Sequence, residues 1–364
     1  MKFRSAAAAS LILLGVAAIL GLAILPLFGH SGTVLIHAGQ EPASQPATEP
    51  APAVLTVTTV RTAPEVSSPN TPAASTPFSS SPPGEDEKST SRKLRVGSWN
   101  VRDCAAWDDA AKERIALHDY VAATIRDAQA DVMLFQEIQS DESKGGDIAL
   151  LSVALAKQGW AMPYTAVINA KGEDDLAVFS RYKIEGEESI LEPAAADPWP
   201  RPGIYARIEV AQIPIHLYGF HFKAMGDAKS EAARKAQASA VAEALAERHA
   251  GALEEDKIIV AGDFNTANPG DLDGAGSTLF TLRSLGDEDP HNDFLALNYQ
   301  FKPNTPSFVD SRYKSVLDHI LVSPSLSSGM SEESIHVIEA VKGPGTIPTS
   351  DHRLLLAEIV LPER

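Results

Sequence analysis

From residue 93 onward, short apolar runs alternate with longer stretches that have helical spacing. The apolar runs are of strand length and end at polar or turn residues, which predicts β-strands. They are Leu94–Trp99, Val132–Phe135, Leu176–Phe179, Ile204–Val210, Ile213–Phe222, Ile258–Ala261, Val316–Val322 and Leu354–Val360. Helical spacing is found in Asp108–Ala128, Gly146–Gln158 and Ser230–His249. Because strands outnumber helices and several helices fall between strands, we predict an α/β domain with a two-sheet core and helices packed outside it.

The amino terminus has a different pattern. Ala6–Phe28 is apolar throughout except for Ser10, and Lys2 and Arg4 precede it. At about 1.5 Å per residue, this segment is long enough to cross the roughly 30 Å of a bilayer core. Its positive flank favours a cytoplasmic amino terminus, so the rest of the chain is expected outside the cytoplasm. A cleaved signal peptide is the alternative, in which case the protein would be secreted.

A tether is predicted after this segment. Residues 41–92 are rich in Pro, Ala, Ser and Thr and lack the apolar content of a packed core. The predicted organisation is therefore a membrane segment within residues 1–40, a linker at 41–92 and one catalytic domain at 93–364. The net charge of −17 argues against tight non-specific binding to nucleic acid as the main task. The single cysteine, Cys104, cannot form an intrachain disulfide and is interpreted as a small packing residue.

Polar side chains recur at the ends of the predicted strands. Acids, amides and imidazoles follow or precede the apolar runs at Asn100, Gln136-Glu137, His221, Asp263, Asn265, Asp318-His319 and Asp351-His352. If these strand ends lie side by side, the groups gather in one cleft. Mg²⁺ prefers oxygen ligands and uses few protein carboxylates, so Glu137 and Asn100 are candidate ligands, with Asp263 and Asp351 able to share the ion. The cleft would then suit attack of water on a phosphoester.

These motifs resemble those of the endonuclease/exonuclease/phosphatase superfamily, the DNase I-like proteins. The matching motifs follow the family order: Ser98-Trp99-Asn100, Phe135-Gln136-Glu137, His221-Phe222-Lys223, Gly262-Asp263-Phe264-Asn265, Leu317-Asp318-His319-Ile320 and Ser350-Asp351-His352. The resemblance covers about Leu94 to Arg364. It implies a four-layer α/β sandwich, in which two packed mixed β-sheets are flanked by helices and the active cleft lies at one end of the sheets.

The resemblance also implies roles for individual residues. The implied metal ligands are Asn100, Glu137 and Asp351, with Mg²⁺ as the expected ion and Mn²⁺ or Ca²⁺ as alternatives. The implied catalytic residues are His221, Asp263, Asn265, Asp318 and His352, with Asp318 holding His352. Arg181 and Lys223 are expected to contact phosphate. His319 is expected to face away from the site, and His30, His118, His216, His249, His291 and His336 are interpreted as surface or packing residues.

The substrate stays open at this stage. A nuclease is the first hypothesis, with nucleic acid as the partner. The domain is compact, and the polar helix with Arg234 and Gln237 that follows His221 and Lys223 resembles the arrangement of exported bacterial nuclease-like members of the family. A phosphodiesterase or phosphatase acting on lipid headgroups or small metabolites is the second, which a membrane segment at residues 6–28 favours. A non-catalytic binding protein is the third, and it is disfavoured because every matched position keeps its functional group. The sequence leaves the oligomeric state undetermined.

Overall fold

The computed structural model of the protein describes residues 92–108, 112–141, 146–170, 175–191, 201–266 and 268–361. The predicted membrane segment at Ala6–Phe28 and nearly all of the predicted linker lie outside these ranges. Within the described residues, no helix is long and apolar enough to cross a bilayer.

The first of two large sheets joins strands from both ends of the domain. Its order is β15-β16-β1-β4-β6-β5. The strands are β1 (Lys93–Asn100), β4 (Val132–Gln136), β5 (Tyr164–Ile168), β6 (Leu176–Ser180), β15 (Ile335–Ile338) and β16 (Leu354–Val360). β1 runs parallel to β4 and antiparallel to β16, and β6 runs antiparallel to β4.

The second sheet has a related arrangement in the order β11-β14-β10-β9-β8-β7. The strands are β7 (Ile184–Ile190), β8 (Gly203–Val210), β9 (Ile213–His221), β10 (Lys257–Asp263), β11 (Leu295–Ala296) and β14 (Asp318–Val322). β9 and β10 are parallel, and β14 runs antiparallel to β10. Each sheet therefore has one parallel pair at its centre with an antiparallel strand beside it.

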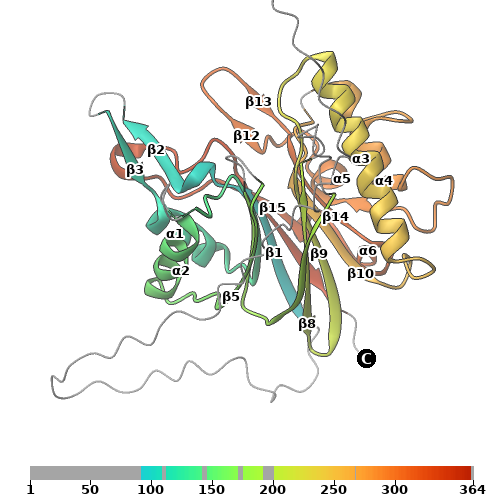
Figure 1. The fold of residues 1–364 in the computed structure, drawn as a ribbon, viewed down its shortest axis with the longest axis horizontal. Coiled ribbons are helices and arrows are strands. Elements are labelled where there is room, and N and C mark those ends of the chain that lie inside the picture. Colours follow the sequence, from blue (N-terminus) through green and yellow to red (C-terminus); the bar gives the residue numbers. More distant parts are fainter. Residues whose placement is uncertain are drawn as a thin grey trace, which may run out of the picture. The chain divides into compact units, whose positions relative to one another are not determined.

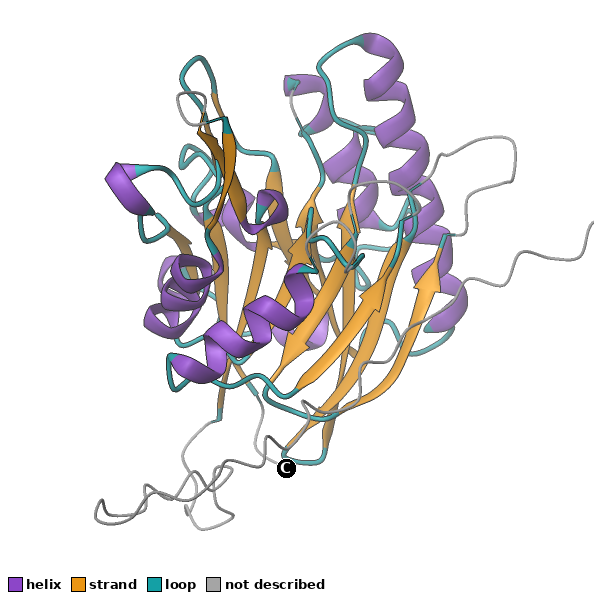
Figure 2. Cartoon of the chain, turned by 60° about the vertical axis from the view of Figure 1, so that its left-hand side comes forward, coloured by secondary structure: helices purple, strands orange, loops and turns teal. Residues whose placement is uncertain are grey.

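The two sheets pack face to face between outer helices (Figures 1 and 2). Buried aliphatic residues such as Leu134 and Leu217 fill the space between the sheets. On one outer face, α1 (His118–Ala128) and α2 (Asp147–Lys157) pack on the first sheet. On the other, α3 (Ala228–Arg248) and α4 (Thr278–Ser284) pack on the second, and two short helices, α5 (Leu297–Phe301) and α6 (Pro324–Ser327), lie nearby. The prediction of a four-layer α/β sandwich is confirmed.

One predicted helix is wrong in its first half. Residues predicted to begin a helix at Asp108 instead form a hairpin, β2 (Ala105–Asp108) paired with β3 (Glu113–Ala116), and α1 begins at His118. An isolated helix needs an apolar face packed on the core for most of its stability. Between residues 108 and 116 only Ile115 is a large apolar residue, whereas the buried face of α1 starts at Leu117 and continues through Val121 and Ile125. A second hairpin pairs β12 (Phe308–Val309) with β13 (Lys314–Ser315).

Candidate active site

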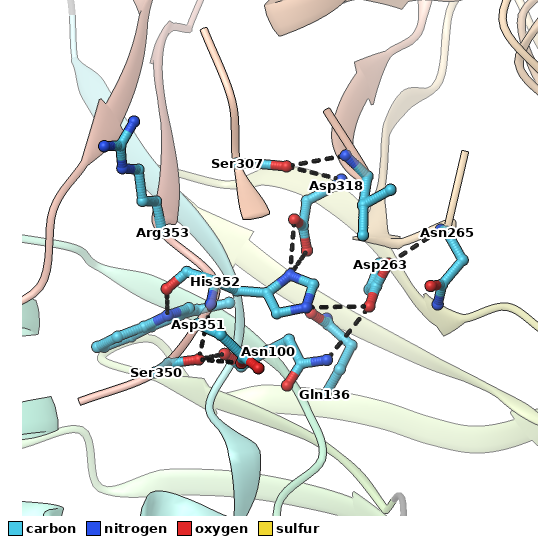
Figure 3. Close-up of polar contacts among 12 residues, drawn as sticks. Asn100, Gln136, Asp263, Asn265, Ser307, Asp318, Ser350, Asp351, His352 and Arg353 are labelled. Atoms are coloured by element: carbon cyan, nitrogen blue, oxygen red, sulfur yellow. Dashed lines mark hydrogen bonds and ion pairs between the residues drawn. The ribbon is translucent and has the colours of Figure 1, made fainter. Parts of the chain in front are cut away.

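The strand directions bring the predicted polar residues together. The carboxyl ends of β1, β4, β9 and β10 deliver Asn100, Glu137, His221 and Asp263, because each central pair is parallel. β14 and β16 run the opposite way, so their starts reach the same edge. Asp318 begins β14 and His352 precedes β16. Figure 3 shows the side chains of Asn100, Asp263, Asp318 and His352 pointing toward one another.

His352 and Asp318 form a buried ion pair. Nδ1 of His352 lies 2.9 Å from Oδ2 and 3.1 Å from Oδ1 of Asp318, and the side chains are almost fully enclosed. The backbone N–H of Asp318 donates to the Ser307 hydroxyl at 3.0 Å, which fixes the start of β14. Burial alone would lower the pKa of His352, but the carboxylates of Asp318 and Asp263 outweigh it and raise this pKa to about 10. His352 is therefore an imidazolium at neutral pH.

Asp263 divides its two oxygens between a turn and the site. Oδ1 accepts the backbone N–H of Asn265 at 2.9 Å, which makes an Asx turn after β10. Oδ2 accepts from Asn100 Nδ2 at 3.2 Å and lies 3.6 Å from Nε2 of His352 and 3.7 Å from Nε2 of His221. Burial raises the pKa of Asp263 to about 6, although the positive charge of His352 opposes the shift. The carboxylate is thus ionised at pH 7, with a proton affinity suited to a general base.

Gly262 allows β10 to run close to β9 immediately before Asp263. A Cβ atom at this position would lie 2.0 Å from the carbonyl oxygen of Phe220, which no side chain can accommodate. The glycine therefore sets the separation of the two strands that present His221 and Asp263.

Glu137 and His221 complete the opposite side of the site. Oε1 of Glu137 accepts from Asn100 Nδ2 at 2.8 Å and lies 3.7 Å from Nε2 of His221. Burial lowers the pKa of His221 well below its usual value, and the positive charges of Arg201 and His352 lower it further. One imidazole is thus held neutral and the other cationic, and such divergence between paired groups is typical of acid–base sites.

The residues around Glu137 fit a divalent cation. Glu137, His221 and Asp263 each offer a ligand atom, and these atoms lie within 4.8 Å of one another. Nδ1 of His221 is buried without a hydrogen-bond partner. The two carboxylates suit Mg²⁺ or Mn²⁺, because these ions prefer oxygen ligands. The amide of Asn100 presents its nitrogen to both carboxylates while its oxygen accepts from the Arg102 N–H at 3.2 Å, so it would have to turn over to act as a ligand.

Three further predicted site residues, Asp351, Asn265 and Lys223, lie outside this group of potential metal ligands. The carboxylate of Asp351 faces Arg102, with Nη1 at 3.8 Å from Oδ2, and Asp351 joins none of the ligand groups found among the described residues. The amide nitrogen of Asn265 donates to the carbonyl of Phe222 at 3.1 Å, and this amide has a second N–H. Lys223 lies two residues after His221, the last residue of β9.

The expectation that Arg181 contacts phosphate does not agree with its position in the structure. Its guanidinium pairs with Asp131 at 3.0 Å and stacks over the ring of Trp160 at 4.3 Å. Ser180, the last residue of β6, pairs with Val132 at the start of β4, whereas Glu137 follows the end of β4. Arg181 therefore lies at the opposite end of the sheet from the cleft. Arg201, which no sequence motif marks, is the arginine whose positive charge lowers the pKa of His221.

A fully buried ion pair supports the loop after His221. Arg234 of α3 donates from Nε and Nη2 to Asp271 at 3.1 and 2.7 Å, and both side chains have no exposed surface. Nη1 of Arg234 donates to the carbonyls of Lys223 and Met225 at 3.0 and 2.6 Å. The N–H of Lys223 donates to Gln237 at 2.9 Å. α3 thus fixes the backbone that leaves the site.

The positive φ angles of the site mark constrained backbone. Glu137 and Asn265 both have φ 50°, and Arg102, Asp103 and Cys104 follow one another with φ 48°, 53° and 46°. Left-handed residues other than glycine cost about 1–2 kcal/mol each and persist where the surroundings determine them. Here the N–H of Asp103 donates to the carbonyl of Glu137 at 2.7 Å, so the strained turn holds the β1 and β4 ends together.

Comparisons with known proteins agree with this geometry. The model of the Endonuclease/Exonuclease/phosphatase family matches residues 97–352, well over half of the chain. No curated protein sequence matches it. An endonuclease/exonuclease/phosphatase from Beutenbergia cavernae DSM 12333 is similar in structure, with 17% identity, a TM-score of 0.51 and coverage of 74% of this chain and 72% of that one.

Two further solved structures share the fold. A humanized D. rerio TDP2 has 18% identity and a TM-score of 0.51, covering 73% of this chain and 98% of that one. The 3′ phosphatase NExo from Neisseria, bound to a product DNA hairpin, has 20% identity and a TM-score of 0.50, covering 73% and 99%. At these identities the similarity to the solved structures shows the fold alone. The family model matches a range, residues 97–352, that also contains the site residues. The chain belongs to the endonuclease/exonuclease/phosphatase family.

Proposed function

We propose that the protein is a metal-dependent phosphodiesterase that cleaves nucleic acid. The observation that carries the proposal is the line of groups Asp318–His352–Asp263, in which an imidazolium and a carboxylate face each other 3.6 Å apart beside Glu137 and His221. A cation next to an ionised base serves hydrolysis, because one group stabilises negative charge on phosphate while the other accepts a proton from water.

The residues divide the reaction as follows. Nε2 of His352 donates a hydrogen bond to a non-bridging phosphoryl oxygen, and Asp318 keeps the ring charged and oriented. Asp263 takes the proton of the attacking water, whose oxygen forms the new P–O bond. The P–O bond to the leaving group breaks, and the leaving oxygen takes a proton from solvent. A divalent ion held by Glu137 and a turned Asn100 would supply positive charge for the phosphoryl oxygens.

The domain is proposed to work outside the cytoplasm, anchored through Ala6–Phe28. The basis is the length of this apolar segment and the preceding Lys2 and Arg4. Protease added to intact and to permeabilised cells tests this topology. Digestion of the domain only after permeabilisation of the inner membrane would contradict it.

Activity is tested on the full-length chain purified in mild detergent. Plasmid DNA, single-stranded DNA, RNA, sphingomyelin and mixed inositol phosphates are each incubated with Mg²⁺, with Mn²⁺ and with EDTA. We expect EDTA-sensitive nicking of DNA, reduced about 10²–10⁴-fold in His352→Ala and Asp263→Asn. The matched control is His291→Ala, an exposed histidine outside the site, which should keep full activity.

The second candidate is a lipid or small-metabolite phosphodiesterase, which the apolar segment favours by keeping the enzyme near lipid. Release of phosphate or phosphocholine without nicking, still dependent on His352, would replace nucleic acid by that substrate class. Nicking that persists unchanged in both site variants would refute the assignment of the site.

A further inference from the structure

A second cluster of potential ligands lies away from the active site, on the far part of β9. It joins His216 of β9, His249 at the carboxyl end of α3 and Asp256 just before β10. One ring nitrogen of each histidine and one carboxylate oxygen all lie within 4.8 Å of one another. His216 comes five positions before His221 on an extended strand, about 16 Å away along it at about 3.3 Å per residue. We propose that this cluster is a zinc site.

Two tyrosines orient the imidazoles. The hydroxyl of Tyr205 lies 3.0 Å from Nδ1 of His216, and the hydroxyl of Tyr218 lies 2.7 Å from Nε2 of His249. These contacts leave Nε2 of His216 and Nδ1 of His249 for the ion. A histidine ligand nearly always uses its other nitrogen in a hydrogen bond of this kind, which fixes the tautomer and the ring orientation. The two imidazoles are therefore preoriented to bind a metal ion.

The charges around the cluster also suit a cation. Burial lowers the pKa of His216 to about 4 and that of His249 in the same direction, so both rings are neutral at pH 7, as metal binding requires. Asp256 contributes a negative charge. The two nearby arginines are neutralised by partners, Arg207 by Glu185 at 2.5 Å and Arg248 by Glu188.

The ligand set indicates the metal. Two imidazoles with one carboxylate are typical of Zn²⁺, whereas Mg²⁺ and Ca²⁺ favour all-oxygen sets. His216 and Asp256 are only half-buried, so water can reach the fourth position of a tetrahedral ion. His249 is buried and its Nδ1 lies 2.7 Å from Oδ2 of Asp256. Zinc would take the place of the proton in that hydrogen bond, and the ring proton would move to Nε2, where Tyr218 accepts it.

An ion here would connect three segments of the domain, namely β9, the end of α3 and the start of β10. α3 also carries Arg234, which holds the loop after His221. The ion, bound by His249, would therefore stabilise the carboxyl end of the helix that supports the active site. The expected effect is structural, namely higher resistance to unfolding.

Zinc binding is measured on the full-length chain by competition with a chromogenic zinc indicator, with excess Mg²⁺ present. The native chain should bind one more equivalent than His216→Gln. His336→Gln replaces an exposed histidine outside the cluster and should match the native chain. Tyr205→Phe should bind zinc about 10-fold more weakly, because it removes only the hydrogen bond to His216 Nδ1. Asp256→Asn gives a second ligand variant should His216→Gln fail to fold.

Thermal unfolding gives an independent readout. Zinc at about 100 times its Kd should raise the midpoint of the native chain by about 5 °C or more, and should raise that of His216→Gln much less. Co²⁺ should produce a tetrahedral visible spectrum that the same variant lacks. Equal zinc stoichiometry and affinity in the native chain, His216→Gln and Asp256→Asn would overturn the proposal.

Discussion

Replacing Arg234 by Met should destabilise the protein strongly although the substitution lies outside the catalytic cluster. The guanidinium and the carboxylate of Asp271 have no exposed surface, so the variant leaves Asp271 as a buried charge without its ionic partner, hydrogen-bonded only to Thr278 and the backbone of Asn268. Removing one member of such a pair costs about 3–5 kcal/mol. The carbonyls of Lys223 and Met225 also lose their donor, but Met225 is 68% exposed, so water can replace part of that loss. We therefore expect Arg234→Met to lower the free energy of unfolding by about 3–5 kcal/mol in total.

The assay is urea unfolding of four proteins: native, Arg234→Met, Asp271→Asn and the double variant. The double variant should be more stable than the sum of the single losses predicts, by about 2 kcal/mol, because it removes both charges together. Lys235→Met is the control on the same helix. Its ion pair with Glu231 is partly exposed to solvent, so the change should stay within about 0.5 kcal/mol. Single losses below about 1 kcal/mol that add up in the double variant would refute this account of the pair.

Three other predictions concern the site and its surroundings. Arg201→Ala should lower kcat/KM at least about 10-fold through lost phosphate attraction, whereas Arg181→Ala at the far end of the sheet should leave it unchanged; equal effects in steady-state assays would contradict the placement of both arginines. Asp318→Asn removes a carboxylate that raises the pKa of His352, so the alkaline limit of activity should move to lower pH, and an unmoved pH profile would exclude a protonated His352. Burial lowers the pKa of His319 from 6.5 to about 4, so the unfolded chain binds more protons in this range and the free energy of unfolding should fall as pH drops from 6.5 to 4, by up to about 3 kcal/mol. Urea unfolding at both pH values should show a weaker pH dependence in His319→Gln.

The sequence was informative where one face or both faces of an element are buried. β1, β4, β9, β10 and β16 lie in sheet interiors and appear as apolar runs, so their ends located the cleft. Among the strands it missed, β5, β7 and β15 are all sheet edges, and β7 has the polar sequence IEGEESI because it has a neighbour on one side only. Edge strands commonly carry charge, which removes the apolar signal.

Strand direction explains the error at Arg181. A polar residue after a strand reaches the cleft only if that strand points toward it, and β6 runs antiparallel to β4. Direction depends on pairing between distant segments, which no local pattern records. Arg201 could not be predicted for the same reason: it precedes β8, no motif surrounds it, and its position near His221 depends on contacts between distant segments. Sequence alone leaves His216 and His249 as surface or packing residues. They meet Asp256 only through the pairing of β9 with β10 and the packing of α3 on the second sheet.

The pairing of β1 with β16 has a consequence for the synthesis of the protein. Lys93 pairs with Val360, and the indole N–H of Trp99 donates to the carbonyl of His352 at 3.0 Å, so the first strand of the domain is completed by the last. A ribosome must translate all the residues from Asn100 to His352 before these two side chains can meet. The growing polypeptide therefore has no assembled phosphoesterase site until its last strand has been added to the first sheet.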